Sequence, residues 1–434
     1  MKNASSSFIT EKLKGATPSA FSAYCILAAF TTYFCMYAFR KPFTAGTFEE
    51  SGLLLGVGYK TILVGAQVFG YTLSKFIGIK VVSEMPAHRR AISILILIGI
   101  AEIALLLFAL TPAPYNFVWL FVNGLPLGMV FGLVLGFLEG RKVTEALAAG
   151  LCASFIVASG VVKSVGRMLI EHGNVSEFWM PVLTGLFFVP PLLLSVWLLS
   201  KIPPPSSSDV AHRSERLPMN RAQRHAFFRR HWVGLVALVF VYIMLTVMRS
   251  IRDDFAVEIW HELGEAGKPA IFAQSELLVM FLVIAITGAA FLIKNNRLAF
   301  MSSLGLVGAG AAIVLLAVVG HWTGVLAPFP FMVLLGLGMY IPYVTYHTMI
   351  FERMLAAFRE IGTIGYLMYL ADAIGYLGYV AMMVFRHWVS TDVNFLNLMI
   401  YCSLAVSAAA IAITIFLAAH YNKRIPPEKL APAE

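Results

Sequence analysis

Residues 91–110 read AISILILIGIAEIALLLFAL, twenty residues with one charged side chain, Glu102. A helix needs about 20 largely apolar residues to cross the hydrocarbon core of a bilayer, so this stretch has the length of a membrane span. Its apolar run is continuous, which excludes the alternating strand pattern of an outer-membrane barrel. Because backbone polar groups in lipid must bond internally, the stretch is predicted to be a helix.

The composition extends this prediction to the whole chain. Of the 434 residues, 59% are hydrophobic and only 13% are charged, whereas soluble domains contain about 25% charged residues. A soluble protein this poor in charge could not cover its surface with polar groups. The composition therefore excludes a soluble enzyme, a nucleic-acid binder and a disordered chain, and it indicates a polytopic membrane protein.

Twelve apolar segments are long enough to be spans. They are centred near residues 30, 69, 101, 128, 158, 190, 243, 282, 310, 340, 373 and 408. The longest polar segment, residues 201–231, separates six spans from six. We therefore expect an N-terminal six-helix bundle (1–200), a basic cytoplasmic linker (201–231) and a C-terminal six-helix bundle (232–434), an all-α arrangement that suits a two-bundle transporter. Channels, membrane enzymes and other transporter folds also reach twelve spans.

The distribution of basic residues predicts the orientation. Most Lys and Arg residues outside the spans lie on the same side as the N-terminus, and the positive-inside rule makes that side cytoplasmic. We expect a multi-pass inner-membrane protein in contact with the lipid bilayer, with its N- and C-termini in the cytoplasm.

Four cations lie within or at the ends of spans: Arg40, Lys75, Lys163 and Arg249. Each costs about 2.5–3.5 kcal/mol at a helix centre on insertion scales. Acids, water or an anionic ligand must offset this cost, so the four residues are the first candidates for a binding site.

Arg40 and Arg249 occupy matching places in the first and seventh spans, which are equivalent helices of the two halves. Facing each other across a central cavity, two guanidinium groups would bind phosphate or carboxylate oxygens bidentately. The alternatives are that Arg40 reaches the outer membrane interface and that Arg249 pairs with Asp253 or Asp254.

Lys75 and Lys163 either add positive potential to the site or pair with a buried acid. The candidate acids are Glu102, Glu139, Glu276 and Asp372. Glu102 and Asp372 are expected to lie deepest, where each either carries a proton or neutralises a lysine.

His347 either couples protons or is a hydrogen-bonded structural residue. Its neighbours Tyr340, Tyr343 and Tyr346 either line a polar cavity or form an aromatic packing seam. The glycines at 128, 132 and 136 have the spacing that lets helices approach closely.

No nucleotide-binding, metalloprotease or nucleophile-elbow motif occurs in the sequence. The four cysteines lie in apolar runs without metal-like pairing, as small hydrophobic residues do. We therefore expect no cofactor, no metal and no catalytic residue.

Three segments carry a resemblance to a known family. Residues 37–43 read YAFRKPF, residues 70–77 read GYTLSKFI and residues 249–254 read RSIRDD. They resemble the Y-x-x-R-K-x-F, YGFSKFI and R-Y-G-x-x-D segments of the organophosphate:phosphate antiporter branch of the major facilitator superfamily, which contains glycerol-3-phosphate and hexose-phosphate transporters. The resemblance implies a major facilitator fold, phosphate binding by Arg40 and Arg249, and a nearby Lys75.

The sequence departs from that branch at three places. Residues 83–86, Ser-Glu-Met-Pro, replace its acid–Arg pair after the second span. The fifth span has Lys163 near the place where the branch carries a binding-site histidine, and Asp372 adds an acid in the eleventh span. The pattern resembles a divergent relative with a changed substrate.

The leading hypothesis is a secondary transporter for a small organic anion, phosphorylated or carboxylated, with no nucleic acid among its partners. Arg40 and Arg249 would hold the anion, and Lys75 and Lys163 would add positive potential. Coupling would use exchange against phosphate or proton symport through Glu102, His347 or Asp372. The alternatives are a non-transporting sensor or regulator that retains the anion site and signals through the linker, and a membrane-embedded enzyme.

Overall fold

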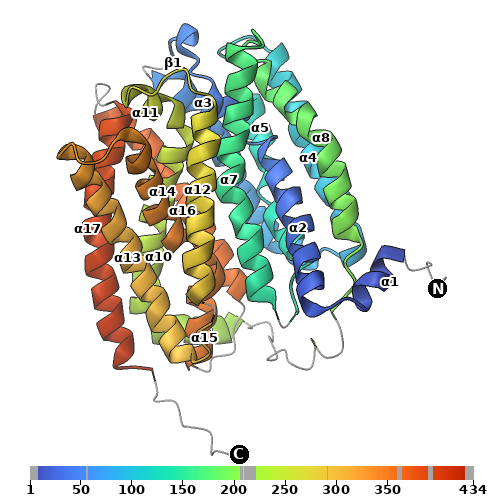
Figure 1. Ribbon diagram of the computed structural model, residues 1–434, viewed down its shortest axis with the longest axis vertical. Helices are drawn as coiled ribbons and strands as arrows, with labels where there is room; N and C mark the ends of the chain where they lie inside the picture. Colours follow the sequence, from blue (N-terminus) through green and yellow to red (C-terminus); the bar gives the residue numbers. More distant parts are fainter. Residues whose placement is uncertain are drawn as a thin grey trace, which may run out of the picture.

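The computed structural model describes residues 8–54, 57–141, 143–205, 209, 221–290, 292–358, 364–389 and 394–425. Long helices run side by side along most of the molecule (Figure 1). A two-stranded hairpin, β1 (Leu53–Leu54) and β2 (Val57–Gly58), lies at one end, which we call the hairpin end. The basic linker falls largely on residues 206–208 and 210–220, which lie outside the described residues.

The N-terminal half contains eight α-helices and two short 3₁₀ helices. The α-helices are α1 (Phe8–Lys14), α2 (Pro18–Tyr37), α3 (Tyr59–Glu84), α4 (Ala87–Leu110), α5 (Phe117–Leu127), α6 (Val130–Leu135), α7 (Thr144–Glu171) and α8 (Met180–Ser200). The 3₁₀ helices η1 (Pro42–Ala45) and η2 (Glu49–Ser51) lie between α2 and the hairpin.

Helices are the regular elements of the C-terminal half among its described residues. It contains α10 (Arg221–Asp254), α11 (Ala256–Glu262), α12 (Ala270–Ala290), α13 (Asn296–Trp322), α14 (Pro328–Thr345), the π-helical turn η3 (Tyr346–Ile350), α15 (Phe351–Phe358), α16 (Ile364–Val389) and α17 (Phe395–Asn422). The short helix α11 lies at the hairpin end.

Helix starts and close approaches follow from local chemistry. The Thr17 hydroxyl accepts a hydrogen bond from the Ala20 amide (3.3 Å) and Pro18 occupies the first turn, so α2 begins with a side-chain cap. A Cβ at Gly128 would lie 2.7 Å from the Cβ of Ser74, and one at Gly70 would overlap the backbone of Phe121. Gly70 and Gly128 therefore let α3 approach α5 closely, and Gly128 is one of the three glycines whose spacing predicts a close approach.

The helices have membrane-span dimensions. Ten segments of the described chain are long and apolar enough to cross a bilayer. Helices α3 and α16 have 26 residues each but are not among the ten, and the apolar part of α16 covers Leu370–Phe385. Each half presents large apolar side chains on its exterior, such as Ile103, Leu194 and Phe281, as lipid contact requires. The all-α membrane fold is confirmed, while the exact count of twelve stays a prediction.

Helices of the two halves meet along two seams. Helix α3 packs on α16, and α7 packs on α12, which lie adjacent in Figure 1. Elsewhere α2–α8 pack mainly on one another, and so do α10–α17. The boundaries 1–200, 201–231 and 232–434 remain a prediction. The four cations found from the sequence all lie on or beside the helices that line these seams.

Candidate functional site

Arg40 lies just after the end of α2, in a buried turn. The side-chain amide of Asn123, in α5, donates hydrogen bonds to the carbonyl groups of Phe39 (2.9 Å) and Ala101 (3.0 Å), which fixes this turn against α4 and α5. Arg40 is only 2% exposed. It therefore does not reach the outer interface, and that alternative is wrong.

Aromatic rings surround the Arg40 guanidinium group. Its Cζ lies 3.6 Å from the ring centroid of Tyr71, 5.6 Å from that of Tyr376 and 5.8 Å from that of Tyr37. Its Nε is buried and has no hydrogen-bond partner among the residues that the structure describes. A desolvated cation–π contact contributes about 2 kcal/mol or more, whereas burying an ion costs several kcal/mol after relaxation. The rings therefore offset only part of the cost of this charge.

Arg249 lies in the last turns of α10 and is 4% exposed. Its Nη2 donates a hydrogen bond to the hydroxyl group of Tyr376 (3.2 Å), and its Cζ lies 4.4 Å from the ring centroid of Tyr343 and 6.0 Å from that of Tyr340. Its Nε also lacks a partner. Asp253 and Asp254, its alternative partners, instead accept bonds from lysines.

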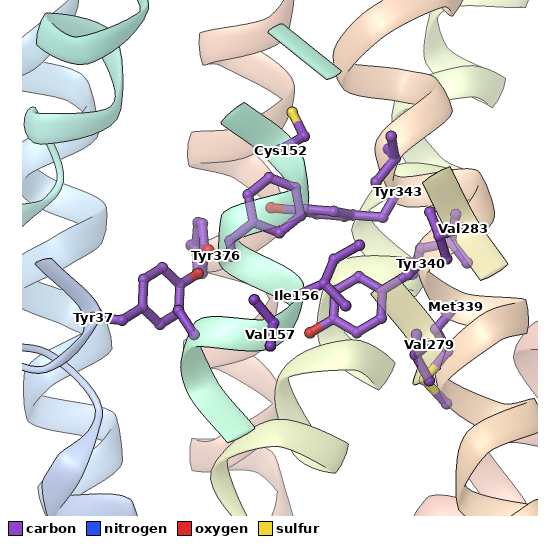
Figure 2. Close-up of a cluster of buried hydrophobic side chains, with 14 of the residues drawn as sticks. Tyr37, Cys152, Ile156, Val157, Val279, Val283, Met339, Tyr340, Tyr343 and Tyr376 are labelled. Carbon is purple, nitrogen blue, oxygen red and sulfur yellow. The ribbon is translucent and has the colours of Figure 1, made fainter. Parts of the chain in front are cut away.

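The two arginines meet at Tyr376. We call the surrounding side chains, Tyr37, Tyr71, Tyr340, Tyr343 and Tyr376, the tyrosine cage. Figure 2 shows four of them: Tyr37 comes from α2 and Tyr376 from α16, while Tyr340 and Tyr343 come from α14. Both halves therefore contribute to the cage, as a site at the interface of two bundles requires.

From the sequence, Tyr340, Tyr343 and Tyr346 either line a polar cavity or form an aromatic packing seam, and the structure places the three differently. Tyr340 and Tyr343 pack on Phe155 of α7 and also lie under Arg249. Tyr346 is not part of the tyrosine cage, and its hydroxyl group donates a hydrogen bond to the Leu238 carbonyl of α10 (2.9 Å).

Lys75 and Asp372 form an ion pair across the seam between α3 and α16. The Lys75 Nζ lies 2.7 Å from Asp372 Oδ2, and the Tyr242 hydroxyl donates to Asp372 Oδ1 (2.8 Å). Lys75 also lies 5.2 Å from the ring centroid of Tyr71, so it borders the tyrosine cage. Lys75 thus pairs with one of the four acids that the sequence offered as its partners, beside the arginines.

Lys163 belongs to a different group. It pairs with Asp253, which was not among its predicted acids, and it donates to Ser159 (2.6 Å). Lys41 bridges Asp253 (3.0 Å) and Asp254. We call Lys41, Lys163, Asp253 and Asp254 the carboxylate cluster. The structure places Lys163 in this cluster, paired with Asp253, and its predicted contribution to a binding site stays a prediction.

Two further ion pairs lie near the hairpin end. Lys60 contacts Glu258 of α11 (2.6 Å), and Arg252 contacts Glu276 of α12 (2.7 Å). Burial raises the pKa of the Glu258 carboxyl group, and the adjacent Lys60 ammonium group opposes that shift. The sequence analysis did not predict these two pairs, although it included Glu276 among the candidate buried acids.

His347 lies beside the cage in the π-helical turn η3. Its Nδ1 is hydrogen-bonded to the Tyr343 carbonyl oxygen (2.9 Å), and its ring lies 5.8 Å from Phe155 and 6.1 Å from Phe131. This hydrogen bond is the kind of contact expected if His347 is a structural residue. Single π-helical turns occur frequently at functional sites.

Glu102 lies away from these groups, at the contact of α4 with α8. Its carboxylate faces Gly185, and both carboxylate oxygens are buried without a hydrogen-bond partner. The structure therefore does not bring Glu102 to His347 or Asp372, the other two coupling candidates.

The buried cations are of two kinds, those with a carboxylate partner and those without one among the described residues. Seven lysines and arginines are buried among the described residues: Arg40, Lys41, Lys60, Lys75, Lys163, Arg249 and Arg252. Five of them have carboxylate partners, and those partners are Asp253, Asp254, Glu258, Glu276 and Asp372. Within the described chain, Arg40 and Arg249 have no carboxylate partner, so they leave two uncompensated positive charges at the cage.

Other candidate sites are weaker. A pocket of about 220 Å³ at the hairpin end is lined by both acids and bases, including Glu171, Glu258, Arg167 and Lys268, so its charge favours no anion. Within the part of the chain that the structure describes, no group of three or more His, Cys, Asp or Glu side chains is placed to hold a metal ion.

A family model matches residues 42–424, and its description is a family of unknown function (DUF5690). The chain belongs to this family. No curated protein sequence matches the chain.

Solved structures of transporters share the fold along nearly the whole length. A D-xylose-proton symporter is 12% identical with a TM-score of 0.56, over 94% of this chain and 98% of that one. A peptide transporter, POT, in complex with alafosfalin is 14% identical with a TM-score of 0.60, over 97% and 100%. The human organic anion transporter MFSD10 (TETRAN) is 15% identical with a TM-score of 0.56, over 93% and 100%.

At these identities the likeness concerns the fold. The chain therefore has the major facilitator fold, as the sequence resemblance predicted. Membership of the organophosphate:phosphate antiporter branch stays a prediction.

Proposed function

We propose that the protein is a secondary transporter that moves a small organic anion across the membrane by alternating access. The anion, phosphorylated or carboxylated, binds between Arg40 and Arg249, and Lys75 adds positive potential. The single observation that carries this proposal is that these two buried arginines, from opposite halves, meet at Tyr376 without a carboxylate partner in the described chain.

The chemistry of the two side chains supports an anion. A guanidinium group presents five N–H donors in a planar fork that matches carboxylate and phosphate oxygens. Each of the two forks uses few donors within the protein, and both Nε atoms are buried without a partner. An anion would satisfy those donors and neutralise the remaining charge at once.

The contacts between the halves support alternating access. Lys41 and Lys163 from the N-terminal half hold Asp253 and Asp254 of α10, and Lys60 holds Glu258 of α11. These ion pairs join the halves near the hairpin end, which is the external end in the predicted inner-membrane orientation with cytoplasmic termini. The described conformation is closed there, and opening would separate these ion pairs.

The proposal is tested by uptake into proteoliposomes that contain the purified protein. Glycerol 3-phosphate, glucose 6-phosphate, inorganic phosphate and succinate are supplied as labelled anions. We expect saturable uptake of at least one anion by the wild type. Arg40→Lys and Arg249→Lys should lose it, because lysine keeps the charge but not the fork.

Lys268→Gln is the matched control. It removes an exposed cation whose carboxylate partner among the described residues is Glu265, so uptake should remain at the wild-type level. Wild-type uptake in both Arg→Lys variants, with normal membrane insertion, would contradict the proposed anion site.

A further inference from the structure

We propose that transport is coupled to a proton carried by Asp372, and that Lys75 moves between Asp372 and the bound anion. This inference rests on the proposed function, since it needs an anion at the two arginines. It identifies the coupling ion and the residue that carries it.

The starting state is an ion pair between the halves. Asp372, in α16, is 5% exposed, and among the described residues two groups hold its carboxylate, the Lys75 ammonium group of α3 (2.7 Å) and the Tyr242 hydroxyl group of α10 (2.8 Å). Its negative charge is therefore neutralised by a single cation from the opposite half.

That cation lies within reach of the anion site. The Lys75 Nζ is 5.2 Å from the ring centroid of Tyr71, and the Arg40 guanidinium group lies 3.6 Å from the same centroid. Tyr242 connects the two places as well, because its ring stacks on Tyr343 (5.6 Å), which lies under Arg249. A lysine ammonium group on a flexible four-carbon stem can redirect toward an anion seated between the arginines.

Movement of Lys75 changes the state of Asp372. The carboxylate would keep one neutral hydrogen bond, from Tyr242, and no cation. A buried ion without its partner is destabilised by several kcal/mol, and binding a proton removes that charge. Anion binding would therefore cause the Asp372 carboxylate to take up one proton, and anion release would return Lys75 and expel the proton.

Asp372 is the carrier because of what faces it. The charged and titratable groups that interact with it are Lys75 of α3, Tyr242 of α10, Cys152 of α7, Tyr343 of α14, His347 of η3 and Tyr376 of α16. Tyr71 and Arg249 contact Tyr376 in turn. His347 already uses Nδ1 at the Tyr343 carbonyl oxygen. Arg249 is hydrogen-bonded to Tyr376. Lys75 is thus the cation whose movement would leave a carboxylate unpaired.

The test measures protons taken up on anion binding. Purified protein in detergent is titrated with each of the four anions at pH 7.5, in buffers of different ionisation enthalpy, by isothermal calorimetry. We expect uptake of about one proton per bound anion in the wild type, as linkage requires for a carboxyl group that becomes neutral on binding. Asp372→Asn should bind the anion and take up none.

Two further variants keep the test decisive. Lys75→Gln leaves Asp372 unpaired in both states, so it should also abolish proton uptake, even if Asp372→Asn fails to fold. Glu276→Gln neutralises a comparable buried acid paired with Arg252 and should keep the wild-type value.

The outcomes separate this inference from the proposed function. Anion binding by the wild type without proton uptake, or undiminished uptake in Asp372→Asn, would overturn the proton coupling and leave the anion site standing. Failure of all four anions to bind the wild type would overturn both.

Discussion

The carboxylate cluster and the tyrosine cage both bury cations in the same protein, but they satisfy them differently. In the cluster, Lys41 and Lys163 contact Asp253 and Asp254, so the four charges cancel. In the cage, the contacts that Arg40 and Arg249 make among the described residues are with tyrosine rings and one hydroxyl group. The comparison teaches that burial alone does not distinguish a structural cation from a candidate binding residue, and that the presence or absence of a carboxylate partner is the feature to test.

The largest expected effect comes from removing one of the two arginine side chains from the tyrosine cage. Arg40→Ala or Arg249→Ala should lower anion uptake about 100-fold or more, because each removes a charged donor fork, and hydrogen bonds to charged groups contribute about 1.5–3 kcal/mol each. Rates in proteoliposomes at matched protein density measure it. A loss below about tenfold in both variants would place the anion elsewhere.

The next effect comes from breaking the carboxylate cluster. Asp253→Asn leaves Lys41 and Lys163 with one carboxylate between them, and removal of one partner of a buried ion pair costs about 3–5 kcal/mol. We expect a clear drop in the thermal unfolding temperature, with anion affinity per folded molecule retained. An affinity loss as large as that of Arg249→Ala would show that the cluster and the cage are one site.

A double variant sharpens the same point. Lys163→Met with Asp253→Leu replaces a buried ion pair by apolar side chains, which is often neutral or stabilising relative to breaking the pair. The double variant should unfold at a higher temperature than Asp253→Leu alone. If it is less stable than the single variant, the pair stabilises the protein in its own right.

A smaller effect is expected at the edge of the hairpin end. The Glu258 side chain is 18% exposed and paired with Lys60, so solvent weakens this ion pair. Glu258→Gln should lower stability by less than Asp253→Asn, measured by the same thermal unfolding. An equal or larger loss would contradict the ranking by burial.

The smallest effect is expected at Glu102. Its carboxylate is buried without a partner and faces Gly185, away from the cage. Because an unpaired buried charge is unfavourable, Glu102→Gln should leave stability equal or slightly higher and leave anion-linked proton uptake unchanged. Loss of proton uptake in this variant would restore Glu102 as the coupling residue.

The sequence predicted the parts that depend on hydrophobic runs and on single buried charges. The long apolar runs are helices, and Arg40 and Arg249 face a common centre as their matching positions suggested. The pair formed by Lys75 and Asp372 was among the alternatives. These features could be predicted because a charged side chain in a membrane span needs a compensating contact, whichever helix it packs against.

The rest depends on how helices rotate and pack against one another. Lys163 and Asp253 are separated by 90 positions, and Lys60 and Glu258 by 198, so no local spacing links them. The orientation of Glu102 toward α8 likewise depends on the rotation of α4. Tertiary packing decides which residues become partners, and the apolar content of the helices does not determine that packing.

The most direct test of the central claim is thermal unfolding of purified protein with and without each of the four anions, in the wild type, Arg40→Ala and Arg249→Ala. We predict that at least one phosphorylated or carboxylated compound raises the unfolding temperature of the wild type, as a ligand of the native state must, and that neither variant responds. Stabilisation that persists in both variants would contradict the account. Stabilisation by neutral or cationic compounds alone would contradict it equally.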